Sequence, residues 1–463
     1  MSKYIFLEEA VSKIGETVWI KGWVAARRNM GKIVFLDIRD RSGVVQVVGV
    51  GNDLDQHSID VLSNVRLGWL VEINGIVQKR GDKQKSFVVQ LDRIEILVLN
   101  IFIISESEAL PFEVEQNTLE LSEGMRLKYR YLDIRSERVK NNLKKRQEIN
   151  LFLRNYFSKQ GFWEIETPYL TKGTPEGARE FVIPSRIHKG NFYVLPQSPQ
   201  QFKQLLMVAG IERYYQVVRC FRDEDQRGDR QPEFTQFDLE MSFIDQEDIL
   251  QLIEKAMIDL VKELFPNLRM QQIPFPRLTY MEAQKLYKSD KPDLRTEQDP
   301  NLLAFGWIID FPLFEYSDTE KKMVSVHHPF TRPKNDDINM MEEKPEKVRA
   351  EAYDLVLNGF EVGGGSLRIF ERDLQKKVFQ ILGLNETEIS LRFGHLLEAF
   401  SFAPPPHGGI ALGLDRLIAI LLNEKNIREV IAFPKTGDAK DLMMGAPSEI
   451  SKEVLNELHI KGV

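Results

Sequence analysis

Alternating hydrophobic and polar positions dominate the first hundred residues of the chain. β-Branched or aromatic residues alternate with polar ones over residues 17–28, 31–50 and 69–80, which is the period-two pattern of half-buried strands. Short strands at this spacing, broken by Gly31 and Gly43, predict a small closed barrel or a sandwich. An OB-fold, which binds single-stranded nucleic acid, is the favoured form. A barrel with a purely structural role stays open as the alternative.

A helical period replaces the alternation further along the chain. Apolar residues recur every three or four positions through residues 139–160, and the pattern stops at Gly161. Beyond it, the patterns predict strands at residues 192–196 and 212–221 and helices at residues 249–265 and 347–358. Strands separated by single helices, without a regular βαβ rhythm, predict an antiparallel α+β domain.

Composition narrows the class of protein. The 463 residues include 62 Lys and Arg against 69 Asp and Glu, a net charge of −7, and 43% of them are hydrophobic, as is typical of folded proteins. Cys220 is the only cysteine, which excludes an internal disulfide and a multi-cysteine zinc site. The single cysteine, the lack of a signal-peptide core and the lack of a long apolar run predict a cytoplasmic protein without a membrane partner.

A basic segment lies within this acidic chain. Between Ser122 and Arg146 there are nine basic residues and three acidic ones. Such a run is most often a solvated helix face. Beside a nucleic-acid-binding barrel it also suits a phosphate backbone, so both interpretations stay open.

Residues 217–243 carry the most informative polar cluster. Arg222, Asp223 and Glu224 end a predicted strand, and a second strand resumes at Glu233. An arginine at a strand end is able to bind a phosphate bidentately, and Phe234 offers a flat face for stacking a base. The alternative is a charged hairpin with surface salt bridges.

Two glycine-bearing segments lie downstream. Residues 363–365 are three glycines in a predicted strand, a costly choice that usually marks a ligand lying against the backbone. Asp354 and Glu361 nearby supply hard oxygen ligands suited to Mg²⁺ bound through nucleotide phosphates. The second segment, GLDR, opens an apolar helix in which Arg416 is placed to stack over an aromatic base. A glycine-rich turn with two surface acids and an ordinary helix start are the alternatives.

Two short motifs complete the set. Glu176 lies in a polar, glycine-bearing stretch suited to a mobile lid. His327 and His328 form a pair, but no cysteine or third histidine stands at ligand spacing, so zinc is not expected. A hydrogen-bonded structural pair is favoured instead.

The order of these motifs resembles that of the class II aminoacyl-tRNA synthetases. A helix followed by a strand with Pro168 comes first, then FRDED and RQPEFTQFD, then GLDR. With the N-terminal barrel, the chain is similar to the subclass of aspartyl, asparaginyl and lysyl enzymes. The strings MRLKYRYLDIR, TPEGAREF, LPQSPQQFKQLLM, SDKPDLR, HHPFT, EVGGGSLRI and IAFPK resemble the bacterial-type aspartyl enzymes over nearly the whole chain.

The resemblance implies an α+β architecture with three parts. It implies an anticodon-binding OB-fold at residues 1–108, a hinge at 109–138 and a catalytic domain on a six-stranded antiparallel sheet at 139–463. The domain-sized insertion usual in bacterial-type members is missing or reduced to a loop near residues 296–307.

The resemblance further implies a reaction and partners. ATP activates L-aspartate to aspartyl-adenylate, with Mg²⁺ as cofactor, and the aspartyl group passes to the 3′ end of tRNA(Asp). The family forms homodimers through the first motif, which implies Pro168 at the interface.

Roles for individual residues follow from the same resemblance. The implied catalytic residues are Arg222, Glu224 and Arg416. The implied ATP-binding residues are Arg222, Asp223, Glu224, Gln231, Phe234, Glu361, Gly413, Leu414, Asp415 and Arg416, with Phe234 and Arg416 sandwiching the adenine. The implied aspartate-binding residues are Glu176, Gln200, Lys203, Arg222, Asp238, His327 and Arg368. Asp354 and Glu361 would bind the metal. For the tRNA anticodon, Phe35 would stack on a base, Gln46 would read a base by hydrogen bonding, and Arg27 and Arg28 would contact the phosphates.

Lys203 and Arg368 favour aspartate over asparagine. They would face the side-chain carboxylate, and an amide in its place would leave buried cations without a partner. An asparaginyl enzyme, which is not expected to keep Lys203, and a synthetase-like paralogue that does not charge tRNA stay as alternatives.

Two barrel positions bear on tRNA choice. The apolar Met30 favours an enzyme restricted to tRNA(Asp), although charging of tRNA(Asn) stays open. Val88 stands where the family usually has an acidic reader of the first anticodon base, which predicts unusual recognition of that base.

Overall fold

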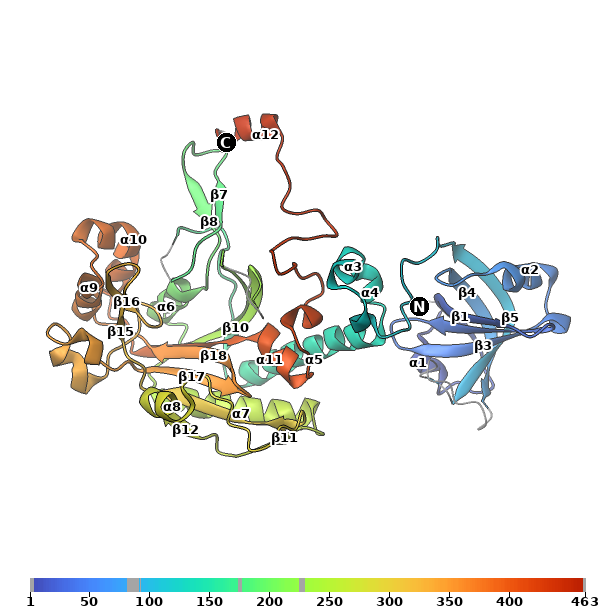
Figure 1. Ribbon diagram of the computed structural model, residues 1–463, viewed down its shortest axis with the longest axis horizontal. Coiled ribbons are helices and arrows are strands. Elements are labelled where there is room, and N and C mark those ends of the chain that lie inside the picture. Colours follow the sequence, from blue (N-terminus) through green and yellow to red (C-terminus); the bar gives the residue numbers. More distant parts are fainter. Residues whose placement is uncertain (1–3, 81–90, 92, 174–176, 225–229, 461–463) are drawn as a thin grey trace. The chain divides into compact units, whose positions relative to one another are not determined.

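The computed structural model describes residues 4–80, 91, 93–173, 177–224 and 230–460 (Figure 1). The chain divides into two compact units, residues 1–141 and 142–463. Each unit has its own hydrophobic core. None of the helices in the described ranges is long and apolar enough to cross a membrane.

The first unit is built around a closed five-stranded barrel. Its strands are β1 (Thr17–Asn29), β2 (Ile33–Arg39), β3 (Val44–Val50), β4 (Leu70–Lys79) and β5 (Ile94–Ser105), in the order β1-β2-β3-β5-β4. Only the β3–β5 pair is parallel. The short helices α1 (Leu7–Ala10) and α2 (Gln56–Asn64) complete the barrel. The predicted barrel is confirmed, because alternate residues such as Leu36 and Ile38 fill its interior.

The basic segment of the first unit is partly buried. It forms α3 (Glu123–Lys128), α4 (Arg130–Asp133) and the beginning of α5 (Glu137–Lys159). Arg126 and Arg130 are buried beside Asp133, with Nη1 of Arg126 3.7 Å from Oδ2 of Asp133. The interpretation of a wholly solvated face is therefore wrong for these two arginines, which neutralise a buried carboxylate.

The second unit is centred on an eight-stranded sheet. Its order is β12 (Arg277–Thr279), β14 (Phe305–Ile309), β17 (Ala352–Leu357), β18 (Phe360–Leu367), β19 (His407–Gly413), β10 (Glu233–Ser242), β9 (Arg213–Phe221) and β6 (Trp163–Glu164). The six central strands pair antiparallel, as expected, whereas β12 and β6 add to the two edges in parallel pairs.

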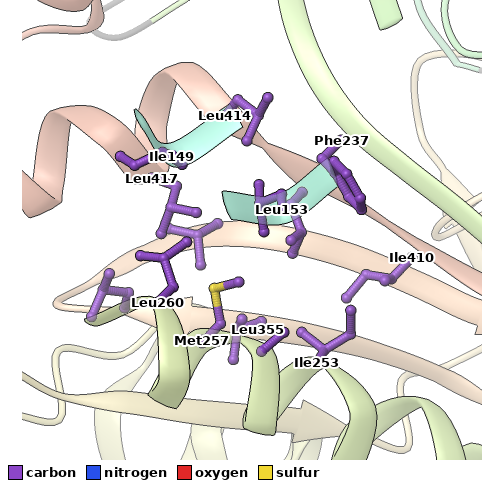
Figure 2. Packing of buried hydrophobic residues seen from close by; sticks show 14 of the residues in the cluster. Ile149, Leu153, Phe237, Ile253, Met257, Leu260, Leu355, Ile410, Leu414 and Leu417 are labelled. Atoms are coloured by element: carbon purple, nitrogen blue, oxygen red, sulfur yellow. The ribbon is translucent and has the colours of Figure 1, made fainter. Parts of the chain in front are cut away.

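Three helices pack on one face of this sheet. Figure 2 shows side chains of α5, α7 (Gln246–Leu264) and α11 (Leu414–Leu421) meeting those of the strands. Along β10, Phe237 and Leu239 enter this core, so the residues between them point to the opposite face. Asp238 is therefore directed away from the helices and toward the site.

The remaining elements lie around the sheet. They are β7 (Val182–Pro184) paired with β8 (Phe192–Val194), α6 (Gln200–Val208), α8 (Tyr280–Tyr287), β11 (Arg269–Met270) paired with β13 (Leu302–Leu303), β15 (Phe314–Ser317) paired with β16 (Lys322–Ser325), α9 (Arg372–Ile381), α10 (Glu386–Ala399) and α12 (Lys452–Glu457). Short 3₁₀ turns are η1 (Gly51–Asp53), η2 (Thr118–Glu120), η3 (Asn335–Met340), η4 (Pro345–Lys347) and η5 (Ile427–Val430).

One element prediction is wrong. The helix expected at residues 347–358 is the 3₁₀ turn η4 followed by the strand β17. Every residue of β17 is buried, and the strand pairs with both β14 and β18. Pairing in the centre of a sheet outweighs a local helical pattern here.

Candidate active site

Two neighbouring cavities open on the sheet face opposite α5, α7 and α11. The first has a volume of about 290 Å³, and the predicted ATP-binding residues in its lining are Arg222, Glu224, Gln231, Phe234, Glu361, Gly413, Asp415 and Arg416. The second has a volume of about 180 Å³, and the predicted aspartate-binding residues in its lining are Gln200, Lys203, Arg222, Asp238, His327 and Arg368.

The two cavities meet at a shared wall. Arg222, Gln236, Glu361 and Ala411 line both of them. Gln236 was not among the predicted site residues. Its position two before Asp238 on β10 places both side chains on one face, and this spacing is the signal that could have found it.

Arg222 is held where an anion could bind. Its guanidinium carbon lies 5.2 Å from the centre of the Phe234 ring. Its Nε is buried and has no hydrogen-bond partner among the described residues. A buried guanidinium N–H without a partner is costly unless a ligand accepts from it.

Three residues predicted to bind ATP are bonded elsewhere, buried in the core or outside the cavities. Gln231 donates from Nε2 to the carbonyl of Lys435 at 3.0 Å and accepts from the Lys435 N–H at 2.8 Å. The side chain of Leu414 is fully buried in the core of Figure 2, and exposed Asp223 lines neither cavity. The Leu414 side chain packs among apolar residues on the helix side of the sheet, and the ATP contact predicted for Leu414 stays a prediction.

Asp415 anchors the start of α11 rather than projecting freely. Its Oδ1 lies 2.5 Å from Nη1 of Arg146, and its Oδ2 accepts from the backbone N–H of Thr235 at 2.8 Å. Arg416 donates from Nη1 to the carbonyl of Glu361 at 2.6 Å. These bonds tie the helix to β10 and β18, and so fix the wall of the first cavity.

Asp354 and Glu361 bring two carboxylates together over Gly364. A Cβ at Gly364 would lie 2.8 Å from Oδ1 of Asp354 and 3.3 Å from Oε1 of Glu361, so the strand leaves room for both. The charge of Asp354 and burial raise the pKa of Glu361, although Arg416 and His327 oppose the shift. Within the described ranges, no group of three or more His, Cys, Asp or Glu could hold a metal ion.

The pKa values of the two histidines shift in opposite directions. His327 lies with Nε2 3.2 Å from Oδ1 of Asp354. Burial lowers the pKa of His327, but the Asp354 carboxylate outweighs it and the net shift is upward. Burial and the charge of Arg368 hold the pKa of His328 well below its usual value, so this ring is neutral and its Nε2 accepts from Nη1 of Arg368 at 2.6 Å.

Glu240 holds the two predicted cations of the second cavity. Its carboxylate oxygens accept from Nε and Nη2 of Arg368 at 2.9 and 3.1 Å, and Oε2 lies 3.3 Å from Nζ of Lys203. Burial opposes its ionisation, but Arg368 and Lys203 outweigh burial and lower the pKa of Glu240. The sequence analysis missed Glu240, whose place two residues after Asp238 on β10 is the signal for it.

Asp238 faces the same cavity, but its pKa is raised where that of Glu240 is lowered. Its Oδ2 lies 3.0 Å from Nζ of Lys203, while Oδ1 is buried without a partner among the described residues. Burial raises the pKa of Asp238 to about 6, although Lys203 opposes the shift. Glu176, also predicted for this pocket, lies outside the described residues.

A second polar surface lies on the outside of the barrel. Register pairs Phe35 with Arg28 and Asp37 with Gln46, which places them on one face across β1, β2 and β3. Gln46 is buried, and its Oε1 has no partner among the described residues. The buried Arg80, a residue that the sequence analysis missed, likewise has no partner for Nε or Nη1 within the described part of the chain. Such atoms are suited to the edges of unstacked bases.

The guanidinium of Arg27 binds backbone carbonyls of the barrel unit. It donates from Nε and Nη2 to the carbonyl of Leu62 at 3.2 and 3.1 Å, and from Nη2 to that of Ser63 at 2.9 Å. These carbonyls belong to the last turn of α2, so Arg27 caps the helix, and Nε and Nη2 are bonded away from the predicted phosphate contact. Arg28 is half exposed and lies 3.1 Å from Oδ1 of Asp37.

Two further predicted positions, Met30 and Pro168, are on the surface. Met30 is 72% exposed, whereas Val88 lies outside the described residues. Pro168 is exposed, and so are Trp163 and Leu170 in the same segment of the sequence, at 63% and 54%.

Comparison with known proteins places this architecture in a class. Residues 122–437, more than half of the chain, match the family model of tRNA synthetases class II (D, K and N), and residues 18–103 match that of the OB-fold nucleic acid binding domain. The fold and the paired cavities thus define a class II tRNA synthetase.

Curated relatives narrow the family. An aspartate–tRNA ligase of Shouchella clausii is 40% identical over 96% of this chain and 96% of its own length. An aspartate–tRNA(Asp/Asn) ligase of Dictyoglomus turgidum is 40% identical over 97% of this chain and 96% of its own length. The chain belongs to the aspartate–tRNA ligase family.

Solved structures share the fold. The asparaginyl-tRNA synthetase of Pyrococcus horikoshii with asparaginyl-adenylate has a TM-score of 0.74 at 22% identity, covering 94% of this chain and 99% of that one. The aspartyl-tRNA synthetase of Entamoeba histolytica has a TM-score of 0.72 at 22% identity, covering 93% of this chain and 91% of that one.

Proposed function

We propose that this protein activates L-aspartate with ATP and transfers the aspartyl group to the 3′ end of tRNA(Asp). The observation that carries the proposal is the shared wall of the two cavities, with Arg222 and Gln236 between an adenine-sized pocket and a pocket that holds two cations. Attack of a carboxylate on the α-phosphate requires positioning and charge neutralisation more than a general base.

Within the first cavity, ATP would bind between Phe234 and Arg416. Glu224 would meet the adenine end. The guanidinium of Arg222, whose Nε has no partner among the described residues, would donate to the α-phosphate and the attacking carboxylate. Gln231, whose amide is bonded to Lys435, would support the pocket wall rather than bind the nucleotide.

Asp354 and Glu361 would hold Mg²⁺. The donor set fits a hard divalent cation, because the charge of the neighbouring Asp354 carboxylate raises the pKa of Glu361 and a cation would relieve that repulsion. The bound ion would neutralise the phosphates of ATP as the carboxylate approaches.

In the second cavity, Lys203 and Arg368 would bind the side-chain carboxylate of the substrate. Asp238 and Gln200 would accept hydrogen bonds from its ammonium group, and His327 would close the pocket beside them. An asparagine side chain would place N–H groups against two buried cations, which costs several kcal/mol. This argues for aspartate over asparagine.

Each of the three parts of the chain would have its own function. We assign anticodon recognition to residues 1–108, a hinge to 109–138 and catalysis to 139–463. The alignment with the Shouchella clausii relative runs over 571 residues against 463 in this chain, so at least 108 positions, 571 less 463, have no counterpart here. This difference supports the absence of the usual insertion near residues 296–307.

Partners and location complete the proposal. Exposed Trp163 and Leu170 beside Pro168 suit a homodimer interface, and a monomer by light scattering would contradict it. The buried thiol of Cys220 suits a reducing cytoplasm. Charging of tRNA(Asn) as well as tRNA(Asp) is decided by assaying both transcripts side by side.

The direct test of the activity is ATP–pyrophosphate exchange followed by tRNA charging. Exchange that depends on aspartate, together with charging of tRNA(Asp), supports the proposal. Exchange with asparagine but not aspartate would favour an asparaginyl enzyme, and exchange without charging would favour a synthetase-like paralogue.

A further inference from the structure

A chain of buried hydrogen bonds leads away from the second cavity. It runs from Gln200, which lines the cavity, through Gln204 to His407 and ends at the carbonyl of Pro405. Gln204 and His407 are 0% and 1% exposed and do not line the cavity themselves. The direction of each bond decides what Gln200 presents to a ligand.

The Pro405 carbonyl fixes the state of the His407 ring. Nδ1 of His407 lies 2.8 Å from this oxygen, which can only accept, so Nδ1 carries the proton. Burial lowers the pKa of His407, with Arg368 and Lys203 acting in the same direction, and outweighs Glu240 and the Pro405 carbonyl, which raise it. The ring is therefore neutral, and Nε2 offers a lone pair.

That lone pair orients two glutamine amides in turn. Nε2 of Gln204 lies 3.4 Å from Nε2 of His407 and donates to it, which leaves Oε1 of Gln204 to accept. Nε2 of Gln200 donates to this oxygen at 3.2 Å. The Gln200 amide nitrogen is thus directed into the protein, and its carbonyl oxygen is directed to the cavity.

We infer that Gln204 and His407 are positioning residues that turn the Gln200 carbonyl oxygen toward the amino group of the substrate. The inference rests on the proposed function, in which the second cavity binds aspartate. An ammonium group is a donor only, so it requires an oxygen at this place, and a flipped amide would present N–H groups to it. This series of hydrogen bonds holds the Gln200 amide in one orientation before substrate binds, which reduces the entropy cost of ordering it on binding.

The test uses Gln204→Met in the full-length protein, a change that keeps the length of the side chain and removes both hydrogen bonds. In aspartate-dependent ATP–pyrophosphate exchange, the KM for aspartate should rise about ten- to a hundredfold, the value of one hydrogen bond to a charged group. The KM for ATP should change by less than about twofold. Parallel rises in both KM values would overturn the inference.

Gln201→Met is the matched control. Gln201 lies on the same helix and is 5% exposed, but neither of its amide atoms has a partner among the described residues. This variant should leave the KM for aspartate unchanged. A rise equal to that of Gln204→Met would mean that any disturbance of α6 has the same effect, and would overturn the inference.

Succinate separates positioning from packing, since it has both carboxylates of aspartate and no amino group. Its inhibition constant against aspartate should be the same in the wild type and in Gln204→Met. An inhibition constant that rises together with the KM for aspartate would assign Gln204 a packing role.

Variants of His407 provide a second line if Gln204→Met does not fold. His407→Gln keeps an acceptor near the position of Nε2 and should retain the wild-type KM for aspartate, whereas His407→Met should raise it. In a double-variant cycle, adding Gln204→Met to Gln200→Met should raise the KM for aspartate no further. Additive effects of the two substitutions on this KM would contradict the inference. A wild type without aspartate-dependent exchange would instead reject the proposed function itself.

Discussion

Arg368 donates from Nε and Nη2 to the two carboxylate oxygens of Glu240, at 2.9 and 3.1 Å. Both side chains are buried, and the same carboxylate lies 3.3 Å from Nζ of Lys203. Glu240 therefore fixes the spacing of the two cations before any substrate enters. A preformed pair of cations is what a site for a side-chain carboxylate requires.

Glu240→Gln should destabilise the protein and impair aspartate binding together. Removing one partner of a buried ion pair leaves an uncompensated charge and costs roughly 3–5 kcal/mol. Chemical denaturation measures the free energy of unfolding, and exchange kinetics measure the KM for aspartate. Glu247→Gln is the control, because its pair with Arg277 is largely exposed and should contribute under about 1 kcal/mol. A loss for Glu240→Gln as small as that of the control would contradict the role.

Binding of aspartate should depend on pH through Asp238. Burial raises the pKa of this carboxyl to about 6, and Lys203 opposes the shift, so the group is charged above pH 6 and protonated below it. Only the charged form pairs with an ammonium group. The KM for aspartate should therefore be flat above about pH 7 and rise as the pH falls through 6, by about tenfold per unit.

Asp238→Asn is the control for this pH dependence. It should bind aspartate weakly at every pH from about 5 to 8, without the rise below 6. An equally steep rise in the variant would assign the titration to another group.

Arg27→Met should weaken the barrel more than it weakens tRNA binding. Arg27 caps the last turn of α2, so its loss leaves the carbonyls of Leu62 and Ser63 without their partner and costs about 1–2 kcal/mol. The melting temperature should fall, while the KM for tRNA measured well below it stays within about twofold. A large rise in that KM with an unchanged melting temperature would restore the phosphate contact predicted from the sequence.

Phe35→Ala should separate the two half-reactions. Phe35 is half-buried on the outer face of the barrel, where it offers a ring to an anticodon base worth about 1–3 kcal/mol. Aminoacylation should fall roughly tenfold or more, whereas aspartate-dependent exchange should be unchanged. Equal losses in both assays would contradict an anticodon role.

Much of the fold could be predicted from the sequence because local pattern and tertiary context agree. The alternation in β1 to β4 and the helical period of α5 are confirmed, and Gly161 does end that helix with φ of +83°. The helix predicted at residues 347–358 failed because β17 lies in the middle of the sheet, where both faces are buried and no alternation survives.

Site residues that belong to a sequence motif could be predicted. Residues that act by holding another side chain in place were harder to predict. Arg222, Lys203 and Arg368 could be named from their motifs, and the structure brings them to one pair of cavities. The position of Glu240 beside Asp238 on β10 could be read from the sequence, but the roles of Glu240 and His407 could not, because their partners lie far away in sequence, at Arg368 and Gln204. A one-dimensional pattern does not encode such contacts.

The most direct test of the account is ATP–pyrophosphate exchange by the purified protein with aspartate and asparagine compared side by side. The account predicts exchange that depends on aspartate, with asparagine poorer by at least about a hundredfold in kcat/KM, because the N–H groups of its amide would face the N–H donors of Lys203 and Arg368. Lys203→Met should remove most of the activity with aspartate. Equal or faster exchange with asparagine in the wild type would contradict the central claim.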